Sequence, residues 1–104
     1  MTAAHDAAVS LELTRREAWV VHAALLGHIE RSLDEGDESP LAVSLLEAIE
    51  RDGRAFDETE LRLLRDALAE HLIDPPVSDR PTAERLLAAV EDALQTAPRH
   101  AGEP

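Results

Sequence analysis

The sequence has no cysteine and very few aromatic residues, since Trp19 and Phe56 are its only Trp, Tyr or Phe side chains. Without cysteine, the chain forms no disulfide or thiolate metal site and offers no cysteine nucleophile. The core must therefore consist mainly of Leu, Ala, Val and Ile. Sequences rich in Ala and Leu favour helices over sheets, so we expect an all-α fold with minimal β-structure.

Long hydrophobic runs and targeting segments are also missing. The longest apolar run is far shorter than the roughly 20 residues of a membrane-spanning helix. Residues 1–8 lack both the basic cluster and the apolar stretch of a signal peptide. We therefore expect a cytoplasmic protein with no membrane partner, and its 104 residues fit one domain.

Positive charge is scarce as well. The chain has 22 acidic residues against 10 basic ones, all of them arginine, and its net charge is −12. Such a charge destabilises a small domain by self-repulsion. In molar salt the Debye length falls to about 3 Å, so solvent cations would largely remove that cost. A GC-rich genome would explain the missing lysine but not the acid excess, and we therefore expect a protein adapted to concentrated salt.

The same charge argues against nucleic-acid binding, which needs a basic face for the phosphates. Molar salt weakens that mechanism in any protein, so a nucleic-acid partner stays open. For catalysis, the sequence offers neither a nucleophile-elbow pattern nor a glycine-rich phosphate loop. We expect no enzyme activity, no cofactor and no catalytic residues.

Hydrophobic periodicity and breaker residues divide the chain into short elements. We expect a strand at 9–13, an extended triplet at 54–56, and helices at about 15–33, 40–52, 58–73 and from about 81 onward. Residues 1–8 and 98–104 should be disordered, which leaves 9–97 as a single helical domain.

Two of these helices carry the same start signal. Thr14 with Glu17, and Asp57 with Glu60, have the three-residue spacing of a capping box. In that motif, the first side chain accepts a hydrogen bond from the backbone amide of the second residue, whose carboxylate accepts one from the amide of the first. We expect one helix to begin just after Thr14 and another just after Asp57.

The chain also has the pattern of an internal duplication. A shift of 43 residues superimposes the two capping boxes and places His28 on His71, and a shift of 41 places 45–50 on 86–91. The predicted fold is therefore a four-helix domain of two strand–helix–helix repeats, at about 9–53 and 54–97. Because a lone short strand is unstable in water, the two strands should pair, within the chain or across a dimer.

Two histidines and one loop invite a metal interpretation. His28 and His71 could face each other with Glu30 or Glu70 nearby, a ligand set that suits zinc. The alternative, which we favour, is that each histidine lies near the C-terminus of its helix and interacts with the helix dipole. Residues 53–61 are similar to the junction of an EF-hand loop with its exit helix, but with Glu60 in the twelfth ligand position, Ile49 would occupy the first. We therefore assign no metal ligands.

The remaining candidate is a protein-interaction surface on the first helix. Trp19 and His22 flank its main apolar face. A second row on this helix has small side chains where another helix could approach closely: Val20, Ala24 and Gly27. Either the last helix of the chain or a second chain covers this row. We expect a non-enzymatic interaction module that forms a homodimer, or binds another protein, through this helix.

The alternative is a DNA-associated regulator with a helix-turn-helix-like arrangement around residues 58–73. Arg62 and Arg65 lie on this helix, beside several acidic residues. We expect these arginines to pair with the acids at helical spacing, for example Arg62 with Asp66.

Residues 11–17, followed by a long apolar helix in an acidic chain without lysine, resemble small uncharacterised proteins of halophilic archaea. The resemblance covers most of the chain and depends on composition and on the capped helix. It implies a halophilic origin and no particular activity.

Overall fold

The computed structural model describes residues 9–51, 55–73 and 77–96. In chain order, these residues form β1 (Val9–Ser10), α2 (Arg15–Asp34), α3 (Pro40–Glu50), β2 (Ala55–Phe56), α4 (Glu58–His71), the 3-10 turn η1 (Val77–Asp79) and α5 (Arg80–Thr96). The predicted fold class, four helices with minimal β-structure, is confirmed over these ranges. None of the helices described is long and apolar enough to cross a membrane. The two chain ends predicted to be disordered lie outside the described residues.

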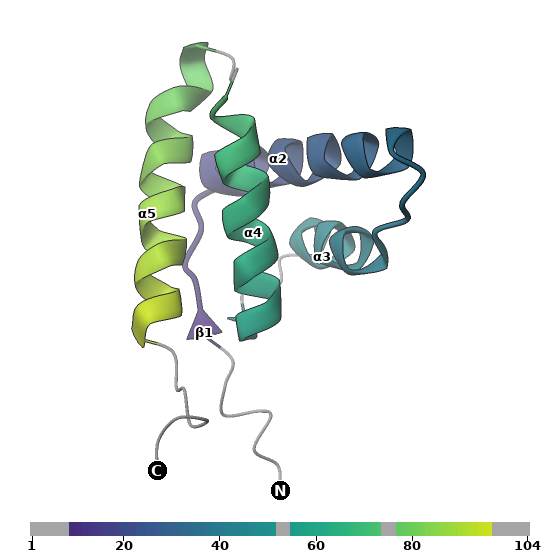
Figure 1. Ribbon diagram of the computed structural model, residues 1–104. Helices are drawn as coiled ribbons and strands as arrows, with labels where there is room; N and C mark the ends of the chain where they lie inside the picture. The colour runs from purple at the N-terminus through teal and green to yellow at the C-terminus, as the bar shows by residue number, and fades with distance from the viewer. Residues whose placement is uncertain (1–8, 52–54, 74–76, 97–104) are drawn as a thin grey trace, which may run out of the picture.

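The four helices form two hairpins that cross each other (Figure 1). α4 and α5 stand side by side, and α2 lies across them with α3 packed beside it. Since α2 contacts α3, α4 and α5, it is covered on more than one side. Its residues Val20, Val21, Ala24 and Leu25 are buried in the shared hydrophobic core. The first long helix therefore has the central position that its apolar sequence predicts.

Both predicted capping boxes are present. Thr14 Oγ1 accepts a hydrogen bond of 3.0 Å from the Glu17 amide, and Glu17 Oε1 accepts one of 2.9 Å from the Thr14 amide. Asp57 and Glu60 repeat the arrangement at the start of α4, with distances of 2.8 and 2.9 Å. Each box satisfies two backbone amides that have no partner inside the helix, so it fixes where the helix begins.

The two short strands pair with each other in an antiparallel sheet. Val9 lies opposite Phe56 and Ser10 opposite Ala55. The predicted strand at 9–13 is longer than β1, because only residues 9 and 10 have partners in this ladder. Leu11 and Leu13 pack against the core from irregular backbone.

The strand register bears on the predicted duplication. The shift of 43 residues makes positions 11 and 54 equivalent. In each pair, the β1 residue precedes position 11 by as many residues as its β2 partner follows position 54. Two units related by a two-fold axis would pair their strands in this register. The corresponding helices differ in length, however: α2 has 20 residues and α4 has 14. The common origin of the two halves stays a prediction.

α2 ends in a Schellman motif, which turns the chain toward α3. The Gly36 amide donates to the Leu33 carbonyl at 3.0 Å, and the Asp37 amide donates to the Ser32 carbonyl at 2.8 Å. Gly36 has a φ of 78°, a left-handed backbone conformation that is energetically unfavourable for residues with a Cβ. The sharp turn allows α3 to run back along α2.

Substitution of the two described glycines by alanine should have opposite effects. Gly36→Ala should destabilise the fold by about 1 kcal/mol, because of its positive φ. Gly27→Ala should stabilise it by up to about 1 kcal/mol, since a Cβ there would meet only the Arg31 guanidinium, at 3.5 Å. Thermal unfolding followed by circular dichroism measures both, with about 4–8 °C expected per kcal/mol for a domain of this size. A lower midpoint for Gly27→Ala would contradict this packing.

Candidate functional site

The outer side of α2 carries three large hydrophobic side chains that remain exposed. Trp19, Leu26 and Leu33 are 66%, 40% and 58% exposed, and they follow one another at intervals of seven residues. Because seven residues make nearly two full turns, these side chains lie along one line of the helix. His22 and Ile29, both half-buried, occupy the intermediate positions. These five residues form the α2 stripe, which has the alternating three- and four-residue spacing of a coiled-coil seam.

Trp19 is held in its exposed position by contacts with its neighbours. Its indole stacks on the His22 imidazole, with the ring centroids 6.1 Å apart and the planes inclined by 9°. His22 Nε2 lies 3.0 Å from Glu50 Oε2 at the end of α3. Arg15 and Ile49 help to line a shallow hollow of about 200 Å³ beside the two rings. A large aromatic side chain is thus presented to solvent in a defined orientation.

A groove of about 430 Å³ lies between α2 and α3 at the other end of the stripe. Ile29 and Leu33 contribute to it from α2, and Pro40 and Val43 contribute from α3. Val43 is 41% exposed. Since Ile29 and Leu33 belong to both features, the groove and the stripe form one continuous apolar surface.

Only part of the predicted contact set lies on this surface. Trp19 and His22 lie on the α2 stripe, whereas Gly27 is half-buried and lies outside it. Val20 and Ala24 are 0% and 1% exposed, which favours the first of the two alternatives for the row of small side chains, burial within the chain, over contact with a second chain. They lie in the core that α2 shares with α4 and α5, and the row of small side chains is therefore covered from within the chain.

His28 and His71 bind different carboxylates and do not share one. His28 Nδ1 lies 3.0 Å from Glu70 Oε1, which also accepts a hydrogen bond from Arg31. Burial on its own raises the pKa of the Glu70 carboxyl, but hydrogen bonds from Arg31 and His28, together with their charges, outweigh it and hold that pKa below its ordinary value. This cluster joins the second half of α2 to the end of α4.

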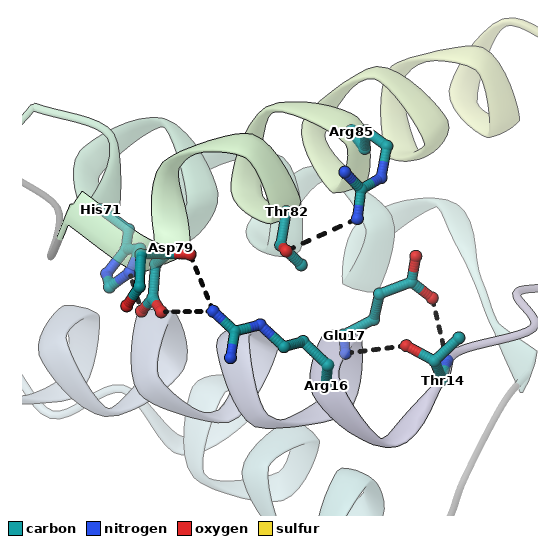
Figure 2. A network of polar contacts seen from close by, with 8 residues as sticks. Thr14, Arg16, Glu17, His71, Asp79, Thr82 and Arg85 are labelled. Atoms are coloured by element: carbon teal, nitrogen blue, oxygen red, sulfur yellow. Dashed lines mark hydrogen bonds and ion pairs between the residues drawn. The ribbon is translucent and has the colours of Figure 1, made fainter.

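His71 belongs to a second cluster, around a buried carboxylate (Figure 2). Asp79, which is 8% exposed, lies 3.3 Å from His71 Nε2 through Oδ2 and 3.7 Å from Arg16 Nη2 through Oδ1. The same Arg16 nitrogen donates a 2.7 Å hydrogen bond to the Ser78 carbonyl. The cluster therefore fastens the first turn of α2 to the turn that precedes α5.

The metal interpretation finds no ligand set in the structure. The described ranges contain no group of three or more His, Cys, Asp or Glu side chains placed to hold an ion. His28 and His71 instead lie in the ion pairs that join neighbouring elements. The metal interpretation places Glu30 or Glu70 near the two histidines as a shared ligand. Sequence spacing revealed neither the pairing of Glu70 with His28 nor the contact of His71 with Asp79, because both carboxylates reach the histidines only through tertiary packing.

The arginines of α4 also have acidic neighbours. Arg62 bonds Glu58 one turn earlier, and Arg65 Nε lies 3.4 Å from Asp66 Oδ1. The expected pair of Arg62 with Asp66 is therefore wrong, although both arginines do pair with acids of their own helix. Glu91 of α5 lies beside them in a shared surface hollow, so this region is not a basic face.

Charge is unevenly distributed along α2. Arg15, exposed at its first residue, forms no ion pair with any residue that the structure describes. Four exposed acids follow near its other end, and across the described ranges they too have no cationic partner: Asp34, Glu35, Asp37 and Glu38. Among the residues that the structure describes, the stripe is thus flanked by an unpaired positive charge at one end and by a cluster of unpaired negative charges at the other.

The fold and the α2 stripe define a small, mainly helical protein of two crossed hairpins with an apolar outer surface. The chain belongs to a family of unknown function, DUF7853, whose sequence profile matches residues 11–91. The matched region includes the capping boxes, the whole α2 stripe and most of α5. No curated protein and no solved structure matches the chain.

The Glu70 cluster predicts a specific acid sensitivity. A carboxyl whose pKa is lowered by folding stabilises the fold above its unfolded pKa and loses that effect as pH falls through the folded pKa. Glu70→Gln should therefore cost about 0.3–1 kcal/mol at neutral pH, and the difference from wild type should vanish in acid. Urea unfolding at a series of pH values measures this. The exposed Glu30→Gln is the control, and an equal loss in both variants would contradict the assignment.

Proposed function

We propose that the protein is a non-enzymatic interaction module that binds a protein partner through the α2 stripe. The observation that supports this most directly is the exposure of Trp19, Leu26 and Leu33 along one line. Single exposed hydrophobic residues are ordinary, but a continuous apolar surface marks an interaction site. The groove beside Leu33 extends this surface onto α3.

We further propose that the module works in a cytoplasm of high salt concentration. The net charge of −12 and the absence of lysine support this. The unpaired acids at 34–38 add to it, since carboxylates without cationic partners repel one another most strongly in dilute buffer. Hydrophobic contacts, by contrast, keep their strength in concentrated salt, so an apolar stripe is a suitable contact surface there.

Salt should therefore raise the stability of the isolated chain. Between about 0.1 M and about 1 M KCl the Debye length falls from about 10 Å to about 3 Å, so the unfolding midpoint should rise as self-repulsion is screened. A variant with Asp34→Asn, Glu35→Gln, Asp37→Asn and Glu38→Gln should show a smaller rise. A midpoint that is constant or falls with added salt would contradict the proposal.

The role of the stripe can be tested with an affinity-tagged chain in an extract of a salt-adapted host. Wild type should capture a defined set of proteins, an untagged copy of itself included. Leu26→Ser combined with Leu33→Ser should lose that set, because the apolar contact is gone. Ile73→Ser is the matched control, since Ile73 is a hydrophobic residue with 81% exposure outside the stripe. Equal capture by wild type and the double variant would contradict the proposed surface.

A DNA-associated role ranks second. It depends on Arg62 and Arg65, and each of them lies beside an acid of α4. A protein without a basic face has little means to neutralise phosphates, so we give preference to the apolar surface.

A further inference from the structure

The α2 stripe is self-complementary, which identifies the kind of partner that fits it. We propose that the partner is a second copy of this chain, whose α2 packs antiparallel on the first with Leu26 at the two-fold axis. This inference rests on the proposed interaction function and names the occupant of the same surface.

The three exposed residues of the stripe are spaced symmetrically about Leu26. Trp19 and Leu33 lie seven residues to either side of it, which is about 10 Å along a helix at 1.5 Å per residue. An antiparallel two-fold at Leu26 therefore sets Leu26 against its own copy, and it sets Trp19 of each chain against Leu33 of the other. His22 lies four residues before Leu26 and Ile29 three residues after it, so these two positions flank the line of contacts and do not face each other.

The surfaces that meet in this arrangement differ in shape. Trp19 projects from α2 with 66% of its surface exposed. The surface beside Leu33 is instead concave, because the groove of about 430 Å³ lies there. The antiparallel register brings the indole of one copy to the groove of the other. It also brings Leu33 of that second copy to the shallower hollow that Trp19 and Ile49 line. The two-fold axis makes this contact twice, as an isologous interface requires.

Charge selects the antiparallel orientation over the parallel one. In the antiparallel arrangement, the unpaired Arg15 of each copy approaches the unpaired acids at 34–38 of the other. A parallel pair would instead bring the two arginines together and set one acidic segment against the other. Like charges facing each other across an interface are unfavourable, so they favour the antiparallel pair over the parallel one.

The overall charge makes the association dependent on salt. Two copies that each carry a net charge of −12 repel each other at low ionic strength. The local attraction of Arg15 for the acids is too small to offset this, so the dimer should form once salt screens the long-range repulsion. With five stripe residues per copy the interface is small, and we expect a dissociation constant on the order of micromolar.

Because the chain has no cysteine, single introduced cysteines can report which residues meet across the two-fold. A disulfide needs Cβ atoms about 3.5–4.5 Å apart. Under mild oxidation in molar KCl, Leu26→Cys should form a covalent dimer, while Leu33→Cys alone should form no disulfide between chains. An equimolar mixture of Trp19→Cys and Leu33→Cys should give the mixed dimer. Ile73→Cys controls for random collision, and sedimentation of the unmodified chain in the same salt should show a concentration-dependent dimer.

Each other outcome overturns the antiparallel dimer. Crosslinking of both Leu26→Cys and Leu33→Cys would indicate a parallel pair. A dimer in sedimentation without crosslinking at Leu26→Cys would place the interface elsewhere. A monomer at all concentrations, combined with capture of other proteins that the Leu26→Ser and Leu33→Ser variant loses, would assign the stripe to a different protein and leave the interaction function standing. A monomer without such capture would remove both.

Discussion

The packing of α2 between the two other parts of the fold is the interaction on which the remaining structure depends. α2 contacts α3 on one side and the α4–α5 hairpin on another. Val20, Val21, Ala24 and Leu25 are almost completely buried by these neighbours. Burial of apolar surface is the main driving force for folding, and in a chain with two aromatic rings it has to come from many aliphatic contacts at one helix. The side of α2 that these contacts leave exposed to solvent carries the stripe.

Polar clusters fix the angle at which the hairpins cross. Glu70 joins α4 to His28 and Arg31 in the second half of α2, and Asp79 joins the turn before α5 to Arg16 in its first turn. The two carboxylates therefore attach α2 at two separate points along its length. A buried or half-buried charge pair adds little net stability, because the cost of desolvation offsets much of its attraction. Here these pairs keep the stripe facing outward, because rotation of α2 would break both clusters.

Sequence reasoning predicted the features that arise from local contacts. Thr14 and Glu17 are three residues apart, and so their hydrogen bonds follow once a helix forms. The pairing of the strands near Val9 and Phe56 also followed, because a short strand needs a partner. The burial of Val20 and Ala24 was left open between two explanations, since a pattern of small residues does not say which helix covers it. Asp79 was missed entirely, because nothing near it in the sequence distinguishes a buried aspartate from the many exposed ones.

In the proposed dimer, the outer stripe of α2 becomes buried where the two copies meet. Trp19 is the only tryptophan, so its emission spectrum reports on this surface without any substitution. The most direct measurement is the emission maximum of the unmodified chain in molar KCl, over concentrations on either side of the micromolar range. We expect emission typical of an exposed indole in dilute solution and a reversible shift to shorter wavelength as concentration rises, because association buries Trp19. An emission maximum that stays at the exposed position in solutions where the chain sediments as a dimer would contradict it.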